Sequence, residues 1–147
     1  NRLYLKNELD EPIAYNFNIE AIGSVSPKQI VKLSMLSLID KLQSIMNAIN
    51  ENNTDKINIS NSKNLMQAYD FKIEHEDDTI GNCITSYLFK RSDVKYCGYF
   101  IPHPFDENII IRIELKNDNS MQNAIQVFID NCIHIQNILN NMINNWS

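Results

Sequence analysis

The chain has 147 residues, 44% of them apolar, which is enough to form the core of one compact domain. Lys and Arg number 13 against 18 Asp and Glu, so the formal net charge is -5 and direct, specific nucleic-acid binding is disfavoured. No apolar run approaches the ~20 residues that span a bilayer, and we expect a soluble intracellular protein without membrane contact. The 3 cysteines show no C-x-x-C spacing, so neither a disulfide framework nor a zinc site is indicated.

The first predicted elements are a strand and a long helix. Apolar and polar residues alternate over 15–21, which predicts a half-buried strand. Residues 26–29 read Ser-Pro-Lys-Gln, a capping-box signature that predicts the start of a helix. The apolar residues that follow keep a helical spacing, so we expect this helix to continue to about residue 50.

A polar stretch separates this helix from the next elements. Residues 51–64 hold two isoleucines among small polar residues, a composition typical of a mobile linker, and we expect a short insertion near Asn58 to be tolerated. Beyond it, alternation over 69–74 predicts a second strand. Residues 77–79 read Asp-Asp-Thr and supply cap residues for a short helix over 80–90.

Two strands and a second long helix complete the chain. Residues 94–101 and 109–115 are rich in β-branched and aromatic side chains, which predicts two strands. The prolines within 102–107 cannot continue a ladder, so this segment is predicted to be the turn of a wide hairpin. Residues 117–120 are suited to cap a helix over 121–146, about 39 Å long.

The two long helices share one pattern of apolar residues. Spacings of four and three alternate along each helix and leave one continuous apolar face on it. A three-stranded sheet is too small to cover two such faces, so we expect the helices to pack against each other. The predicted helix-helix dimerisation seam consists of Val31, Met35, Leu38, Leu42, Ile45, Ile49, Met121, Ile125, Phe128, Cys132, Ile135, Leu139 and Met142.

Three blocks of residues stand in a fixed order in the second half of the chain, at 77–82, 98–104 and 109–115. They follow the patterns His-Thr-Leu-Gly-Asn, Gly-Tyr-x-x-Pro-His-Pro and Ile-x-Ile-Arg-Ile, with Asp78 and Ile80 in place of the His and the Leu. Together they resemble the small assembly subunit of eukaryotic-type DNA-directed RNA polymerases. This is the eleventh-subunit type, related to the N-terminal domain of the bacterial α subunit.

The first half resembles a different subunit. Residues 15–31, a strand-like segment with Gly-Ser before a long helix, are similar to the end of the larger partner, the third-subunit type. The two resemblances imply a fused assembly subunit: residues 1–50 end a larger-partner-like half, 51–64 form a linker, and 65–147 form a smaller-partner-like assembly domain. Such a fusion fits a large DNA virus, with the protein in a cytoplasmic viral factory or virion; otherwise we expect it in the nucleus.

The resemblance also implies a fold and a function. The fold is α+β, an RNA polymerase α-like dimerisation fold with small antiparallel sheets packed with two long helices. The function is that of a non-catalytic assembly platform that docks the two large catalytic subunits and small polymerase subunits, as a pseudo-heterodimer within one chain or a dimer with another copy. No catalytic, metal or cofactor residues are expected. The expected docking residues are Asp77, Asp78, Thr79, Gly81, Asn82, Tyr99, Pro102, His103, Pro104 and Phe105.

A second interpretation of the same residues stays open. The run 74–78 holds four carboxylates and an imidazole, and His103 has the chemistry of a general base, so a small metal- or ligand-binding α+β oligomeric enzyme is the alternative. The run is more typical of a strand end followed by a helix cap, and His103 of a turn. Gly81 and Gly98 are predicted to allow close approach of neighbouring side chains or backbone.

Overall fold

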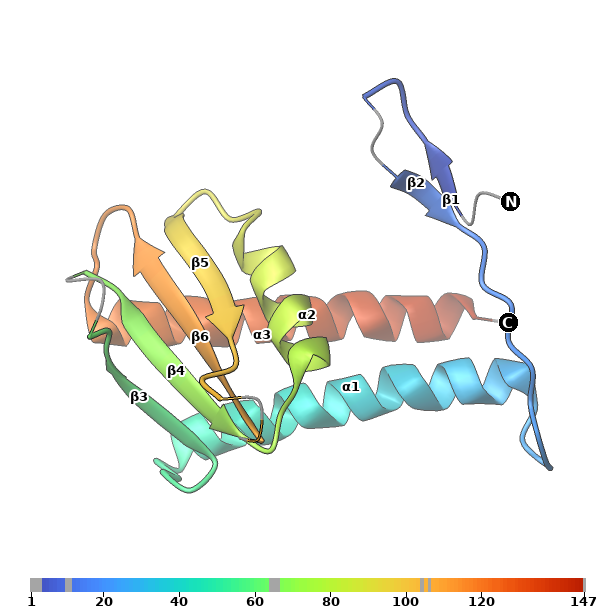
Figure 1. Cartoon of the computed structure of the whole chain (residues 1–147), viewed down its shortest axis with the longest axis horizontal. Helices are drawn as coiled ribbons and strands as arrows, with labels where there is room; N and C mark the ends of the chain where they lie inside the picture. Colours follow the sequence, from blue (N-terminus) through green and yellow to red (C-terminus); the bar gives the residue numbers. More distant parts are fainter. Residues whose placement is uncertain (1–3, 10–11, 64–66, 104, 106, 147) are drawn as a thin grey trace. The chain divides into compact units, whose positions relative to one another are not determined.

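A computed structural model describes residues 4–9, 12–63, 67–103, 105 and 107–146 (Figure 1). Two compact units divide the chain, residues 1–34 and residues 35–147, and helix α1 (Pro27–Asn50) runs from the first into the second. Among the described residues, none of the helices combines the length and the apolar character needed to cross a membrane.

The first unit holds a short hairpin and the start of α1. Strands β1 (Tyr4–Lys6) and β2 (Pro12–Tyr15) pair antiparallel. At the start of α1, the Ser26 N–H donates to Oε1 of Gln29 at 3.1 Å, and the Gln29 N–H donates to the Ser26 hydroxyl at 3.3 Å. This is the capping box that the sequence predicts.

The prediction of a strand over residues 15–21 is wrong. β2 ends at Tyr15, and residues 16–22 have no regular secondary structure. Phe17, which the alternation would bury, is 81% exposed. An alternating pattern becomes a strand only beside another strand that takes up its backbone hydrogen bonds, and the described part of the chain places no strand beside these residues.

The second unit is built on a four-stranded antiparallel sheet in the order β3-β4-β6-β5. Its strands are β3 (Ile57–Asn61), β4 (Tyr69–Glu74), β5 (Val94–Phe100) and β6 (Asn108–Leu115). The strands predicted over 69–74, 94–101 and 109–115 are confirmed to within one residue at each end. Phe71 of β4 lies opposite Ile111 of β6, and both side chains are fully buried on the same face.

Strand β3 lies inside the stretch predicted to be a mobile linker. Its residues pair with β4 from Ile57 opposite Ile73 to Asn61 opposite Tyr69. The linker prediction is therefore wrong for this part, and an insertion at Asn58 would shift the register instead of being absorbed by a loop. The use of residues 51–64 as the border between two family-like halves stays a prediction, and residues 64–66 lie outside the described part of the chain.

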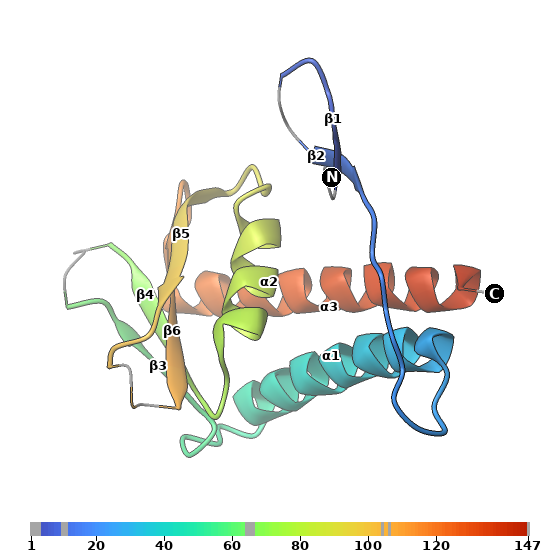
Figure 2. The ribbon, with the colours of Figure 1, turned by 45° about the vertical axis from the view of Figure 1, so that its right-hand side comes forward.

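Three helices lie on one face of this sheet, as Figure 2 shows: α2 (Asp78–Leu88), α3 (Met121–Asn145) and the part of α1 from residue 35 onward. The helices predicted over 27–50, 80–90 and 121–146 are confirmed. The core forms where they meet the sheet, and there the rings of Phe71 and Phe128 stack with centroids 4.6 Å apart. The α+β fold class is thus confirmed.

The predicted seam residues fall into different environments. Met35, Leu42, Ile45, Phe128, Cys132, Ile135 and Leu139 are buried. Val31, Leu38, Ile49, Met121 and Ile125 are half-buried, and Met142 is exposed. Phe128 faces the sheet, since its ring stacks on Phe71. The sheet therefore covers part of the face that the sequence assigns to helix-helix packing, and the role of these residues in dimerisation stays a prediction.

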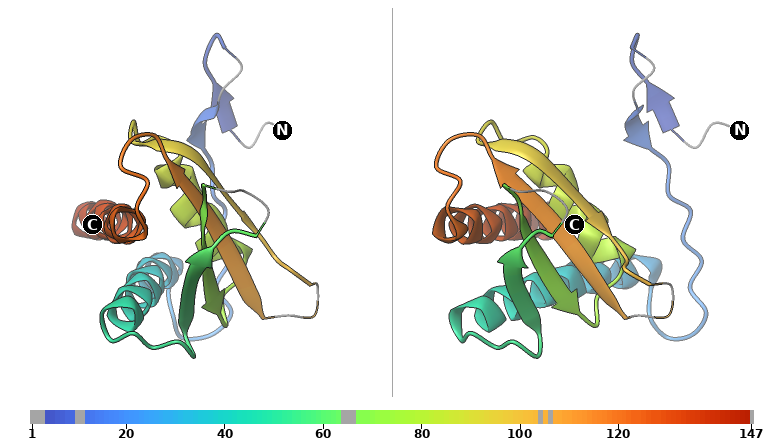
Figure 3. Two further views of the ribbon diagram at one scale, coloured as in Figure 1. Left: turned by 90° about the vertical axis from the view of Figure 1, so that its left-hand side faces the viewer. Right: turned by 60° about the vertical axis from the view of Figure 1, so that its left-hand side comes forward.

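Helices α1 and α3 contact each other within the second unit through a polar side chain. The Gln136 side chain of α3 donates to the carbonyl oxygen of Ile39 at 3.0 Å and to Oε1 of Gln43 at 3.3 Å, both on α1. Figure 3 shows the two helices side by side next to the sheet. The sequence pattern predicts that the helices meet, but it does not single out Gln136.

Candidate subunit-docking site

The candidate site begins at the N-terminus of α2. Asp77 is the N-cap residue, and its carboxylate accepts the N–H of Thr79 at 3.0 Å. Partial burial raises the pKa of Asp77, but hydrogen bonds from Thr79 and Ile80 and the charge of Lys41 outweigh it, so the pKa lies below its ordinary value. The predicted cap is confirmed, and it leaves Asp78, the next carboxylate, exposed.

Gly81 allows the start of α2 to lie against the end of β5. A Cβ at this position would lie 2.6 Å from Cδ2 of Tyr99, so any other residue would collide with the ring. The hydroxyl of Tyr99 hydrogen-bonds to Asp78, and burial together with that negative neighbour raises the pKa of Tyr99. The predicted close approach at Gly81 is confirmed. It brings two of the motif blocks into contact.

The turn between β5 and β6 lies at the same end of the unit as the start of α2. The His75 N–H donates to the carbonyl oxygen of Glu107 at 2.6 Å and ties the two loops together. A cavity of about 340 Å³ lies between them, lined by His75, Glu76 and Asp77 on one side and by Ile101 and Glu107 on the other. The structure therefore groups residues that lie 24 to 32 positions apart in the sequence.

His103 and Phe105 both belong to the segment between β5 and β6. The Phe105 N–H donates to Nδ1 of His103 at 3.2 Å, so the imidazole supports the turn, as the structural interpretation of His103 predicts. The Phe105 ring is 89% exposed. Pro102 is exposed as well, and Pro104 lies outside the described residues.

We call the described residues of this end the docking face: Asp77, Asp78, Thr79, Asn82, Tyr99, Pro102, His103 and Phe105. Most of them are exposed, whereas Gly81, which the sequence also assigns to docking, is buried and acts by packing. The structure thus brings the sequence-predicted residues to one end of the unit. Their role in docking stays a prediction.

The acidic run 74–78 does not gather into one ligand set. Glu74 pairs with Lys72 at 2.6 Å, and Asp77 caps α2. Over the residues that the structure describes, no three His, Cys, Asp or Glu side chains are grouped so that they could hold a metal ion. The run is thus divided between an ion pair, a cap and one buried carboxylate.

The buried carboxylate belongs to Glu76, which the sequence does not single out. Its side chain is only 3% exposed. Oε2 lies 2.8 Å from Nζ of Lys41 on α1, and Oε1 lies 3.2 Å from Nζ of Lys56 just before β3. The hydrogen bond to Glu76 raises the pKa of Lys41. The two ion pairs of Glu76 therefore link the segment just before α2 to α1 and to the connection between α1 and β3.

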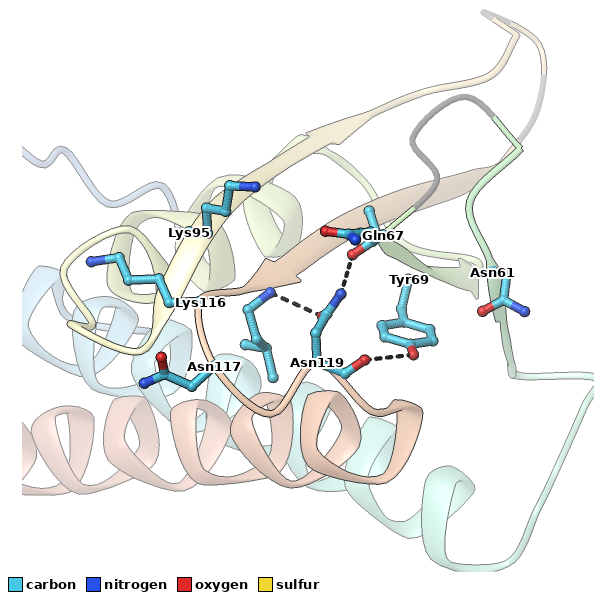
Figure 4. Close-up of a pocket in the computed structure, with 9 residues that line it drawn as sticks. Asn61, Gln67, Tyr69, Lys95, Lys116, Asn117 and Asn119 are labelled. Carbon is cyan, nitrogen blue, oxygen red and sulfur yellow. Dashed lines mark hydrogen bonds between the residues drawn. The ribbon is translucent and has the colours of Figure 1, made fainter.

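A second cavity, of about 320 Å³, lies beside the connection from β6 to α3 (Figure 4). Asn119 makes three hydrogen bonds beside this cavity. Its side-chain amide donates to the carbonyl oxygen of Gln67, and its Oδ1 accepts the Leu115 N–H at 3.1 Å. Its backbone carbonyl oxygen accepts the Tyr69 hydroxyl at 2.9 Å. These contacts hold the connection against β4. We therefore assign these residues a role in the fold and not in binding.

Together, the fold and the grouped motif blocks define a class of protein, an α+β domain whose helices cover one face of a small antiparallel sheet. A family model described as the RNA polymerase Rpb3/Rpb11 dimerisation domain matches residues 68–145. The chain belongs to this family. The match includes all three motif blocks and every described residue of the docking face.

Curated proteins similar to this chain are subunits of RNA polymerases. The chain is 39% identical over 56 residues to the DNA-directed RNA polymerases I and III subunit RPAC2 of Saccharomyces cerevisiae, which covers 38% of this chain and 39% of that protein. It is 34% identical over 71 residues to the DNA-directed RNA polymerase II subunit rpb11 of Dictyostelium discoideum, covering 48% and 59%. The match to RPAC2 of Danio rerio is 32% over 69 residues, covering 44% and 62%. The chain thus spans less than two thirds of each relative.

Proposed function

We propose that this protein is a non-catalytic assembly subunit of a multisubunit DNA-directed RNA polymerase. The observation that carries the proposal is the family match over residues 68–145, two of whose motif blocks meet through Gly81 and Tyr99. On this proposal the chain supplies no residue to nucleotidyl transfer and needs no cofactor. It acts by holding the two large catalytic subunits, and small subunits with them, through surface contacts.

The chemistry of the docking face indicates what kind of surface it would meet. Asp78 in this face and Glu107 close to it in the sequence are exposed carboxylates, and the aromatic ring of Phe105 is exposed as well. Aromatic side chains that enter a partner's pocket commonly carry much of the binding free energy, and charges at the rim guide the approach. We therefore expect the partner to present lysine or arginine residues around an apolar pocket.

The test is capture of the cognate large subunits from extract by the tagged protein. We expect wild type to recover them and the variant Asn82→Ala with His103→Ala to recover far less, because both residues lie in the docking face. The control is Asn117→Ala with His134→Ala, the same residue types exposed on other elements. Circular dichroism confirms that each variant is folded. Equal recovery by both double variants would refute the docking face, and no recovery by wild type would refute the function.

We further propose that α1 supplies the larger-partner-like half, so that one chain forms a pseudo-heterodimer. The resemblance of residues 15–31 to the third-subunit type and the contact of Gln136 with α1 support this arrangement. Light scattering on the purified chain distinguishes it from a dimer of two copies, because the pseudo-heterodimer is expected to be a monomer. The protein would act where its polymerase acts, in a viral factory or virion for a large DNA virus and in the nucleus otherwise.

A further inference from the structure

We infer that Glu76 selects the helix that occupies the position of α1. The sheet would accept a helix that offers a lysine at this contact and reject one that offers an acidic residue. The inference rests on the proposed function, in which a helix-bearing half pairs with a sheet-bearing half. It goes beyond that function by naming the residue that sets the specificity of the pairing.

The backbone before Glu76 directs its side chain inward. His75 has φ of 58°, in the left-handed region that only a small share of non-glycine residues adopt, and its N–H is held by Glu107. Glu76 follows this turn directly, and its carboxylate is nearly inaccessible to solvent, whereas Asp77 and Asp78, the next two residues, are exposed. Glu76 is thus placed where it can act on a packed helix and not on a docking partner.

The two lysines that hold Glu76 have different attachments. Lys56 is fixed to β4 by two hydrogen bonds: the Glu74 N–H donates to its carbonyl oxygen at 2.9 Å, and its Nζ donates to the carbonyl oxygen of Glu74 at 3.2 Å. Lys56 therefore faces Oε1 of Glu76 whichever helix is present. Lys41 of α1 donates a hydrogen bond to Oε2. Loss of such a partner from a buried carboxylate strongly destabilises the folded protein.

Apolar packing alone would select the helix poorly. Cores accept different side chains of similar volume, and α1 and α3 carry the same four-three pattern of apolar residues. The sequence of α3 contains no lysine or arginine and does contain Asp130. A second copy of α3 in place of α1 would therefore leave Oε2 without a cation. Lys56 would still face Oε1, but a buried carboxylate oxygen left without its partner is a known means of rejecting the wrong helix.

Hydrogen exchange of the full chain, read by mass spectrometry, tests the inference. We expect the amides of residues 42–50 to exchange at least tenfold faster in Lys41→Met and faster still in Lys41→Glu. Lys41→Arg should restore protection to near the wild-type level, because it keeps the cation. The amides of β4 and β6 should be unchanged. The matched control is Lys72→Met, which removes a partly exposed ion pair of β4, and it should leave residues 42–50 unchanged.

A further variant separates selection from general stability. In Lys41→Met with Glu76→Gln, the buried carboxylate charge is removed together with the cation of α1, and Lys56 keeps its hydrogen bond to the carbonyl oxygen of Glu74. Residues 42–50 should therefore be better protected than in Lys41→Met alone. The inference is overturned if Lys41→Met leaves these amides unchanged, if protection falls equally throughout the unit, or if the double variant is no better protected. If Lys41→Glu yields no soluble protein, the other variants decide. Because the isolated chain is measured, failure here leaves the capture of polymerase subunits unaffected.

Discussion

The interior of the second unit and its docking face use aromatic side chains in opposite ways. Phe71 and Phe128 stack against each other with no exposed surface, whereas Phe105 at the docking face is almost fully exposed. The interior ring pair contributes to the stability of the core, and the exposed ring contributes little to stability. Substitutions in the second unit should therefore separate into those that prevent folding and those that, on the proposed function, weaken only the binding of partners.

The largest effect is expected for Phe128→Asp. A carboxylate would replace a ring that stacks on Phe71, and burying an unpaired charge there prevents folding. Soluble expression and circular dichroism measure the result. Ile133→Asp, on the solvent side of the same helix, is the control and should remain folded. A folded Phe128→Asp variant would show that the side chain at this position is not buried against Phe71.

The next largest effect is expected for Gly81→Ala, at the boundary between interior and docking face. The added Cβ would meet the ring of Tyr99, and overpacking of this kind costs about 1–3 kcal/mol. Urea unfolding measures the loss. Asn82→Ala, one residue along and exposed, should change stability by less than about 0.5 kcal/mol. Tyr99→Leu combined with Gly81→Ala should recover part of the loss, and no recovery would contradict the contact.

A smaller effect is expected for Asp77→Ala, which removes the N-cap of α2 at a cost of about 1 kcal/mol. The pKa of Asp77 lies below its ordinary value of 3.8, so the stability that it provides is present above that value and is lost as the pH falls through the lower, folded pKa. Asp77→Asn keeps a capping side chain without the titration. The temperature of thermal unfolding should therefore fall less steeply between about pH 5 and pH 2 for Asp77→Asn than for wild type.

The smallest effect on stability is expected for Phe105→Ala, less than about 0.5 kcal/mol, because the ring is exposed. Capture of the large polymerase subunits should nevertheless fall strongly. Thermal unfolding and the capture assay are measured on the same preparation. A clear loss of stability, or unchanged capture, would remove the distinction between the docking face and the interior.

The helices of this fold could be predicted from the sequence, because their signals are long and local. The apolar spacing along α1 and α3 and the caps at Ser26 and Asp77 were sufficient. The strand signals were weaker. Residues 57–61 contain only two isoleucines and are a strand because β4 lies beside them, whereas residues 16–22 alternate well and have no such neighbour.

The candidate site was only partly predictable. The motif blocks identified its residues, but their grouping depends on contacts such as that of Gly81 with Tyr99, which link distant segments. The burial of Glu76 could not be seen in a run of five polar residues, 74–78, that looks uniformly exposed. It depends on one backbone angle, at His75, and on a lysine 35 positions earlier.

The short connection between α1 and β3 has a consequence for how the helix and the sheet stay together. Hydrogen bonds from the N–H groups of Glu51 and Asn53 to the end of α1 continue the helix into the turn that leads to the sheet. Because helix α1 and the sheet belong to one polypeptide, each meets the other at an effective concentration on the order of millimolar, whatever the concentration of the protein. Dilution that would separate a dimer of two chains leaves this pair intact. Synthesis of the chain also produces the two parts in equal amounts, so neither accumulates without the other.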